Sequence, residues 1–283
     1  MTEAPSYKCI LCGSHSHEAT SIKDAKDGEM ISVSLCQSCG HVQLTDVPTV
    51  EDLIAFYKSD YRLSYRNARA PKPKHVLRAG RHAKRRLKAL QPFLQGRETL
   101  LDIGAGGGEF TYLAGKQGLQ TKGIDPASDY LDFAKEAYGV RVQEMGIDDL
   151  SMSEKFDVIT LFHVLEHLPD PTRVFAKAHD LLNEDGLLVI EVPNLDDVHT
   201  SPTNFYFKAH LSYFTATTLN ALASPGFDVE LMEDRDVLFA VFKKRGGSVE
   251  TSYADAASVS RSRNAMGQKT FARYLAHGGA KYR

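Results

Sequence analysis

The sequence has 283 residues, of which 42% are hydrophobic and 25% charged, and its formal net charge is −2. This balance excludes a chain that is disordered throughout, and the length allows one full-sized α/β domain with a smaller module. Met1 to Tyr7 has no secretory-signal pattern, and the most apolar stretch, Phe156 to Leu165, is far shorter than the roughly 20 residues that cross a bilayer. We therefore expect a cytoplasmic protein that has no membrane partner.

All four cysteines lie near the N-terminus, in Cys9-Ile-Leu-Cys12-Gly13 and Cys36-Gln-Ser-Cys39-Gly40. Two residues between thiolates allow both sulfurs to reach one tetrahedral ion, and the glycine that follows lets the backbone turn. Residues 1–45 are therefore predicted to be a zinc ribbon in which Cys9, Cys12, Cys36 and Cys39 bind a structural zinc ion. The alternatives are two disulfides, which a reducing compartment disfavours, or thiols that merely happen to cluster.

Residues 46–97 are predicted to be a linker and a basic amphipathic helix. From Arg62 to Arg97 there are 12 lysines and arginines and no acidic residue, and apolar residues recur at helical spacing from Val76 to Leu94. The basic faces are either a solvated surface or a binding surface for phosphates, of a nucleotide-linked substrate or of RNA. Tyr61 and Tyr65, ahead of the helix, are candidates for lining an acceptor pocket.

Residues 98–245 alternate between strand and helix patterns, which predicts an α/β fold with a doubly wound, mostly parallel, Rossmann-like sheet. The expected strands are Thr99–Ile103, Gln120–Asp125, Arg141–Glu144, Phe156–Phe162 and Leu187–Val192, and the expected helices lie near Phe110–Gln117, Ser128–Tyr138 and Pro171–Leu182. A hairpin is expected from Phe227–Met232 and Val237–Phe242. Residues 246–283 are a basic C-terminal tail, either a flexible arm or a docked helix.

A glycine-rich loop, Asp102-Ile-Gly104-Ala-Gly106-Gly107-Gly108, follows the first of these strands. Glycines at a strand-to-helix turn let the backbone approach a ligand closely and direct helix N–H groups at an anionic group. Asp125, at the end of the second strand, can accept hydrogen bonds from both hydroxyls of a ribose. A dinucleotide site shares these features, but its glycine pattern requires a glycine where this chain has Glu109.

Five segments together resemble the class I S-adenosylmethionine-dependent methyltransferases in order and spacing: Leu101–Gly108, Gly123–Pro126, Phe156–Ile159, His163–Pro171 and Leu182–Gly186. With the zinc ribbon in front, the chain is similar to sugar C-methyltransferases and other polysaccharide-pathway methyltransferases. The resemblance implies a seven-stranded sheet in the order 3-2-1-4-5-7-6, with strand 7 antiparallel. It also implies S-adenosylmethionine as cofactor, bound by Asp102, Gly104, Gly106, Gly108, Asp125, Ile147, Asp148, Phe162 and His163.

The candidate catalytic groups lie in two segments. His163, Glu166 and His167 have the spacing that brings side chains together on one helical turn, and His210 and Tyr213 follow the fifth strand. We expect His167 or His210 to be the general base, with Tyr213 as an orienting or acidic partner. The alternative for Glu166 and His167 is a structural pair that caps the turn. Some relatives bind a divalent ion through an ExxEH pair, but His163 replaces the first glutamate here, which disfavours Mg²⁺.

The leading hypothesis is a methyltransferase acting on a small anionic substrate, a nucleotide-linked sugar or another small glycan or natural-product precursor. The alternative is a methyltransferase of ribosomal or transfer RNA that uses the zinc ribbon and the basic helix to bind RNA. Against RNA, the basic segment lacks the interleaved aromatic residues on which bases stack, and the overall charge is slightly negative. A non-enzymatic adaptor with a cofactor-binding scaffold is a third possibility, which the intact glycine loop and Asp125 disfavour.

Overall fold

The computed structural model describes residues 7–48, 71–126, 130–201, 205–247, 256–269 and 271–277. The chain divides into two compact units. The first consists of Met1–Pro48, His163–Ala176 and Ile190–Arg283, and the second of Thr49–Phe162 and Lys177–Val189. Tyr61 and Tyr65, which we expected near an acceptor pocket, lie outside the described residues.

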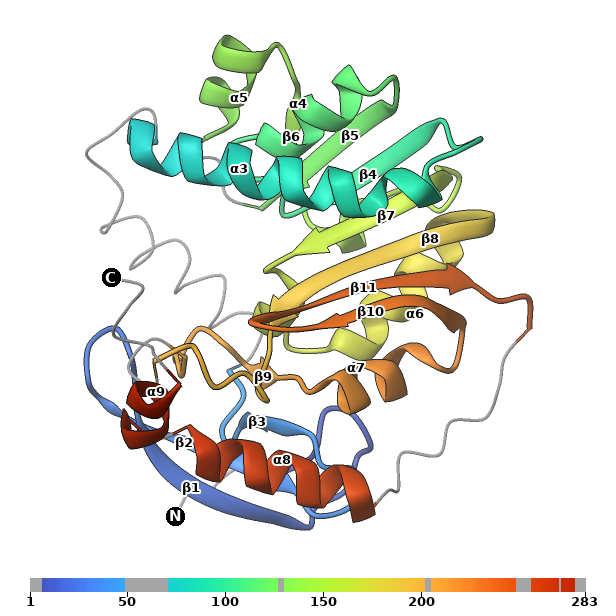
Figure 1. Cartoon of the computed structure of the whole chain (residues 1–283). Coiled ribbons are helices and arrows are strands. Elements are labelled where there is room, and N and C mark those ends of the chain that lie inside the picture. The colour runs from blue at the N-terminus through green and yellow to red at the C-terminus, as the bar shows by residue number, and fades with distance from the viewer. Residues whose placement is uncertain are drawn as a thin grey trace, which may run out of the picture. The chain divides into compact units, whose positions relative to one another are not determined.

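Seven strands form a mixed sheet in the order β10-β11-β8-β7-β4-β5-β6 within the described part of the chain (Figure 1). Their bounds are β4 (Thr99–Ile103), β5 (Gln120–Asp125), β6 (Val142–Glu144), β7 (Phe156–Phe162), β8 (Leu182–Pro193), β10 (Phe227–Asp234) and β11 (Val237–Lys244). β4 pairs in parallel with β5 and β7, β5 pairs in parallel with β6, and β10 and β11 form an antiparallel hairpin. Counted from β4 along the chain, the order is 3-2-1-4-5-7-6, so the expected topology is confirmed.

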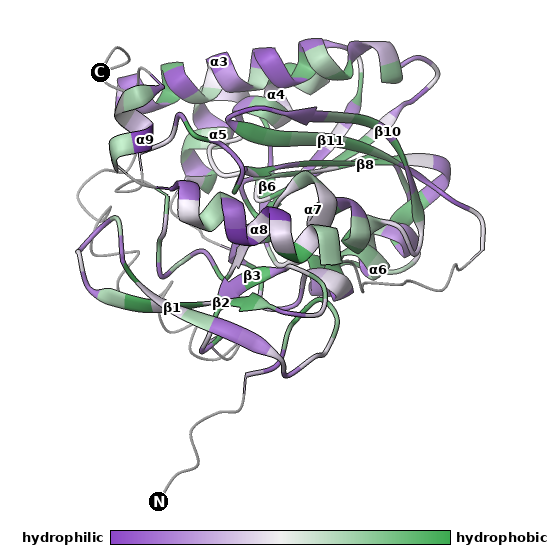
Figure 2. Cartoon of the chain, turned by 60° about the horizontal axis from the view of Figure 1, so that its bottom comes forward, coloured by the Kyte–Doolittle hydropathy of each residue, from purple (hydrophilic) through white to green (hydrophobic). Residues whose placement is uncertain are grey.

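The central strands have continuous apolar runs because parallel strands covered on both faces have no solvent side. Leu100 and Leu101 of β4, Val158 and Ile159 of β7, and Leu188–Ile190 of β8 are all fully buried. Figure 2 shows β8 and β11 in the green of hydrophobic residues. β8 begins at Leu182 rather than at the expected Leu187, and the Asn183 side chain donates a hydrogen bond of 2.7 Å to Asp157 of β7.

The helices that join these strands are α4 (Glu109–Lys116), α5 (Leu131–Tyr138) and α6 (Pro171–Leu181). The predicted basic helix is α3 (Pro73–Leu90), followed by a 3₁₀ turn, η2 (Gln91–Phe93). A proline stands in the first turn of α3, and Ala83, Leu87 and Leu90 form its buried face, which packs against α4. Among the described residues, no helix is both long enough and apolar enough to cross a membrane.

A second sheet belongs to the first unit and has the strand order β1-β2-β3-β9. β1 (His17–Lys23), β2 (Met30–Cys36) and β3 (Val42–Leu44) come from the predicted ribbon, but β9 (Ser212–Tyr213) comes from the segment that follows β8. β9 pairs with β3 in antiparallel register, with Val42 opposite Tyr213. The ribbon sheet therefore extends beyond residues 1–45 by a strand distant in sequence.

The tail contains α8 (Ala256–Gln268) and α9 (Phe271–Ala276), and α7 (Ala216–Ala223) precedes β10. α8 packs against β2, as Figure 1 shows, and buries Val259 and Ala265. Of the two alternatives for the tail, residues 256–268 therefore form the docked helix. The segment has few apolar residues, so its hydrophobic pattern alone did not decide between the two.

Candidate functional site

The glycine loop lies against the end of β5. The amides of Gly104 and Ala105 donate hydrogen bonds of 2.8 and 3.0 Å to the Ile124 carbonyl, and the amide of Gly106 donates one of 2.9 Å to the Asp125 carboxylate. Gly104, Gly106 and Gly108 all have positive φ, a conformation that residues with a Cβ rarely adopt. A Cβ on Gly106 would have no protein atom within 4 Å, so the loop backbone faces open space at this residue.

Asp102 is buried behind the loop, with 2% of its surface exposed. Its two oxygens accept hydrogen bonds from the hydroxyls of Thr160 and Thr111, at 2.8 and 2.9 Å. Burial raises the pKa of Asp102 to about 6, against the opposing effect of these two hydrogen bonds. With both oxygens occupied, any contribution of Asp102 to cofactor binding acts through the shape of the loop.

The remaining cofactor candidates of the second unit surround the same strand ends. The amide of Met145 donates to the Asp125 carbonyl at 3.2 Å, which brings the 3₁₀ turn η3 (Ile147–Asp149) next to that strand end. Ile147 is half-buried and Asp148 is exposed. Phe162, at the end of β7, meets the ring of Phe110 edge-on at 4.7 Å.

Arg86 of α3 joins this group, a role that its place in the basic segment did not reveal. Its guanidinium carbon lies 4.3 Å from the centre of the Phe162 ring. Its charge also lowers the pKa of Asp102, although less than burial raises it. One arginine of the predicted phosphate surface therefore faces the cofactor candidates instead of solvent. Helical spacing places Arg86 beside the buried face of α3, three residues after Ala83 and four before Leu90, whereas Arg85 is exposed.

In the first unit, the histidine candidates gather around Glu166. A 3₁₀ turn, η4 (Leu165–His167), carries Glu166, whose side chain is 1% exposed. His163 has φ of 57°, and its Nδ1 lies 3.3 Å from Glu166 Oε1. His167 Nε2 lies 3.9 Å from the same oxygen. The structure therefore brings His163, Glu166 and His167 together, with Glu166 and His167 on the 3₁₀ turn and His163 two residues before it.

Glu191, a residue that the sequence analysis did not single out, holds His163 from the other side. Its Oε1 lies 3.2 Å from His163 Nε2, and its carbonyl accepts a hydrogen bond of 2.8 Å from the His163 amide. Burial opposes a charge on His163, but Glu166 and Glu191 outweigh it and raise the pKa of His163 to about 9. The signal for Glu191 was a single carboxylate in the apolar run of β8.

His210 and Tyr213 reach this cluster through the loop before β9. The amide of Leu211 donates to the Glu166 carbonyl at 2.7 Å, and the rings of His167 and His210 meet edge-on at 4.8 Å. Burial lowers the pKa of His210 to about 4. The Tyr213 hydroxyl donates to the Phe207 carbonyl at 3.1 Å, so Tyr213 is placed to hold the loop that carries His210.

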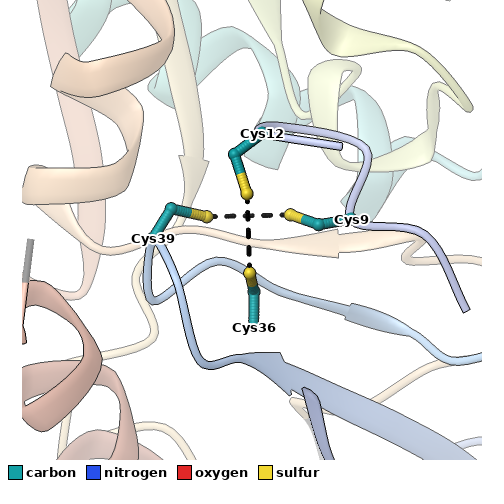
Figure 3. A group of neighbouring side chains, drawn as sticks. All are labelled: Cys9, Cys12, Cys36 and Cys39. Atoms are coloured by element: carbon teal, nitrogen blue, oxygen red, sulfur yellow. Dashed lines mark hydrogen bonds between the residues drawn. The ribbon is translucent and has the colours of Figure 1, made fainter. Parts of the chain in front are cut away.

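The four cysteines form a compact group (Figure 3). Cys9 Sγ lies 3.6 Å from Cys39 Sγ, and Cys12 Sγ lies 3.6 Å from Cys36 Sγ, with the two lines crossing. A tetrahedral zinc ion with Zn–S distances of about 2.3 Å separates its sulfurs by about 3.8 Å, so these are two opposite edges of such a tetrahedron. All four cysteines are free thiols, so the disulfide alternative is not realised.

Both knuckles turn at their glycines, Gly13 with φ of 73° and Gly40 with φ of 74°. The amides of Gly13 and Gly40 donate to the carbonyls of Cys9 and Cys36, at 2.8 and 3.0 Å. The second knuckle also supports α8, because a Cβ on Gly40 would lie 2.6 Å from the backbone of Ser258. Within the described residues, one further group has ligand atoms as close as these: those of Glu166, His167 and His210 lie within 4.8 Å of one another.

Comparison with known proteins agrees with the fold. The ubiquinone biosynthesis O-methyltransferases of Haemophilus ducreyi and Glaesserella parasuis are 33% and 36% identical over 106 residues, which is 34% of this chain and 45% of each relative. The chain therefore spans less than half the length of these curated relatives. The crystal structure of Burkholderia thailandensis 1,6-didemethyltoxoflavin-N1-methyltransferase with bound S-adenosylhomocysteine covers 73% of this chain and 96% of its own, with TM-score 0.56 and 20% identity. At this identity, the likeness concerns the fold alone.

A family model described as a methyltransferase domain matches residues 75–230, just over half of the chain. The matched region begins in α3 and runs into β10, so it includes the glycine loop, Asp125 and the cluster around Glu166. The chain belongs to this methyltransferase-domain family.

Proposed function

We propose that the protein transfers the methyl group of S-adenosylmethionine to a small acceptor. The observation that carries the proposal is the pairing of the glycine loop with Asp125, whose carboxylate lies 2.9 Å from the Gly106 amide. The loop leaves open space in front of its backbone for the methionine part of the cofactor, and Asp125 is placed to accept the ribose hydroxyls. Phe162 and Arg86 would complete the cofactor site of the second unit.

The cluster around Glu166 would supply the acid–base chemistry. His163 has a carboxylate near each ring nitrogen, so both nitrogens carry protons and the ring is an imidazolium that accepts no further proton. His167 Nδ1 lies 2.8 Å from the Ala209 carbonyl, which only accepts hydrogen bonds, so Nδ1 carries the proton and Nε2 has the lone pair. We therefore propose His167 as the general base, with Glu166 stabilising the imidazolium that forms.

His210 and Tyr213 would position this base. The His210 ring packs edge-on against His167, and its lowered pKa keeps it neutral near pH 7, so it adds no charge that would oppose protonation of His167. Tyr213 fixes the loop through its hydrogen bond to the Phe207 carbonyl. Methyl transfer from a sulfonium is an in-line displacement, so the protein mainly places the acceptor and removes its proton.

The four cysteines would hold a structural zinc ion. Four thiolates at the corners of a tetrahedron fill the coordination shell and leave no position for a substrate. The ion would join the segment at Cys9 to the hairpin at Cys36, and β9 continues that sheet to the loop of His210. Zinc would therefore support the loop that carries His210 without taking part in the reaction.

For the acceptor we propose a nucleotide-linked sugar or another small glycan or natural-product precursor. The support is the basic face of α3, where Arg78, Arg81, Lys84 and Arg85 stand in a helix without an acidic residue. This face also suits RNA, which is the second candidate. The curated relatives are named ubiquinone biosynthesis O-methyltransferases, so a hydroxyl group of a ubiquinone precursor is the third acceptor class that the experiment has to separate.

The test uses purified protein, methyl-labelled S-adenosylmethionine and a lysate with its small nucleotides and lipids. Label in a small pool sensitive to phosphodiesterase supports the nucleotide-linked acceptor, label released by RNase supports RNA, and label in the organic extract supports a ubiquinone precursor. His167→Asn should lower turnover by roughly 10²- to 10⁴-fold with unchanged affinity for S-adenosylhomocysteine. The exposed His277→Asn is the matched control. Full turnover by His167→Asn would exclude it as the base.

A further inference from the structure

The first unit contains a cavity that the methyl-transfer cluster does not use. Its volume is about 630 Å³, within the range of small-molecule sites. One wall is the face of the β1–β2 hairpin that presents Ile22 and Leu35, and the opposite wall is the face of α8 that presents Arg263, Met266 and Gly267. These three residues of α8 have i, i+3, i+4 spacing, so they share one side of the helix.

Tyr206 lines the same cavity with a buried hydroxyl. The residue is 2% exposed, and its hydroxyl has no hydrogen-bond partner anywhere in the described part of the chain. Burial of a hydroxyl without a partner costs free energy, so such groups are rare in native proteins. Tyr206 is also held firmly, because its carbonyl accepts a hydrogen bond of 2.7 Å from the Ala25 amide. Tyr206 therefore lines the cavity with a fixed side chain whose hydroxyl has an unused donor.

The charges around the cavity favour an anion. Glu18 is paired with Arg263 at 3.0 Å, and Asp24 accepts hydrogen bonds from the amides of Lys26 and Lys208. Both acidic groups that line the cavity are therefore already engaged. Lys23 also lines it, is exposed, and forms no ion pair with any residue that the structure describes.

We propose that this cavity binds an amphipathic organic anion. The apolar body of the ligand would lie between Leu35 and Met266, the Tyr206 hydroxyl would donate a hydrogen bond to it, and Lys23 would pair with its charge. Because apolar side chains from both walls enclose the space, a bare inorganic ion would leave most of the surface unsatisfied.

The ligand proposed for this cavity is distinct from the acceptor of the methyl group. The Tyr206 ring lies 5.1 Å from the Tyr213 ring, and the Tyr213 ring lies 6.1 Å from His210. Two rings therefore stand between the cavity and the histidine cluster. They also couple the two places, since a ligand that fixes Tyr206 restrains the ring against which Tyr213 packs. The proposal does not depend on the methyl-transfer reaction.

The test measures binding of 8-anilinonaphthalene-1-sulfonate, an aromatic sulfonate that fluoresces in apolar sites, with S-adenosylhomocysteine present to fill the predicted cofactor site. Gly267→Leu fills the cavity from a helical position where a Cβ meets no atom within 4 Å, so we expect affinity to fall more than 10-fold. Gly80→Leu on α3 is the matched control, because it is also helical and equally open. No binding to the unmodified chain, or equal binding by both variants, overturns the proposal.

Tyr206→Phe gives a second readout that does not require the Gly267 variant to fold. Loss of the donor should weaken the sulfonate about 5- to 10-fold. Without the probe, the same substitution should raise Tm by roughly 2 °C, because it removes a buried hydroxyl that lacks a partner. If Tyr206→Phe lowers Tm, or leaves sulfonate binding unchanged, the hydroxyl is not a free donor and the proposal fails.

Discussion

Gly40→Ala should release α8 from the second cysteine knuckle. The methyl group would lie 2.6 and 2.7 Å from the carbonyl carbon and oxygen of Ser258, and 2.7 Å from the amide nitrogen of Val259. These are backbone atoms of α8, so no flexible side chain can move aside. Carbon atoms in contact prefer about 3.5–4.0 Å, so the helix must shift by roughly 1 Å or detach.

The cost has two parts. A residue with a Cβ at φ of 74° costs about 1–2 kcal/mol relative to glycine. Detachment of α8 exposes Val259 and Ala265, which at roughly 0.8 kcal/mol for each buried carbon adds about 2–3 kcal/mol. Together the free energy of unfolding should fall by about 3–5 kcal/mol, which corresponds to a decrease in Tm of roughly 10 °C.

Gly13→Ala is the matched control because it separates strain from collision. Gly13 has the same place in the first knuckle and nearly the same φ, 73°, but its Cβ would meet only the flexible end of Lys8, at 3.8 Å. This variant should therefore lose only about 1–2 kcal/mol. Hydrogen exchange should show faster exchange of residues 256–268 in Gly40→Ala and not in Gly13→Ala. Equal Tm values and equal exchange in the two variants would refute the docking of α8 on Gly40.

Three further predictions concern the cofactor, the metal and pH. Asp125→Ala should weaken S-adenosylhomocysteine binding by about 10- to 100-fold in calorimetry, because hydrogen bonds to a charged group contribute about 1.5–3 kcal/mol. Asp132 is exposed, so the control variant Asp132→Ala should bind S-adenosylhomocysteine normally. Cys39→Ser should reduce the zinc content measured by atomic emission, and a variant with one zinc per chain would contradict the four-thiolate site. The pKa of His163 is raised to about 9, so this residue should contribute stability below pH 6.5 that is lost as pH rises through 9. The pKa of His210 is lowered to about 4, so this residue should contribute stability above pH 6.5 that is lost as pH falls toward 4. Denaturant unfolding of His163→Gln and His210→Gln across pH tests both signs, and pH-independent differences from the unmodified chain would contradict them.

The topology of the large sheet could be predicted because its signals are local. Each strand is an apolar run bounded by turn residues, and the bounds of β4, β5 and β7 agree with the expectation to the residue. The glycine loop and Asp125 stand at the ends of adjacent parallel strands, so the chain order alone places them at one edge of the sheet. For these cofactor-binding candidates, the order of the strands along the chain therefore predicts which residues lie close together.

The cluster around Glu166 was only partly predictable. The spacing of His163, Glu166 and His167 indicated that they meet, but Glu191 is distant in sequence and looked like an isolated charge in a buried strand. Its role depends on the left-handed backbone of His163, which turns that ring between two carboxylates. Positive φ at a residue other than glycine has no sequence signal of its own.

The ribbon was predictable as a metal site but not as a scaffold. The CxxCG pattern determines which sulfurs can meet, because both thiolates of a knuckle come from one turn. The pattern does not show that β3 pairs with β9, or that α8 packs on Gly40, since both partners lie more than 150 residues further along the chain.

These long-range contacts connect the ribbon to the candidate catalytic residues. β9 includes Tyr213, whose hydroxyl holds the His210 loop, so loss of the ribbon should disturb His210 while the glycine loop and Asp125, in the other unit, keep their own hydrogen bonds. A chain stripped of metal should therefore keep its affinity for S-adenosylhomocysteine and lose turnover. Equal loss of both would show that the ribbon supports the whole fold rather than the histidine cluster alone.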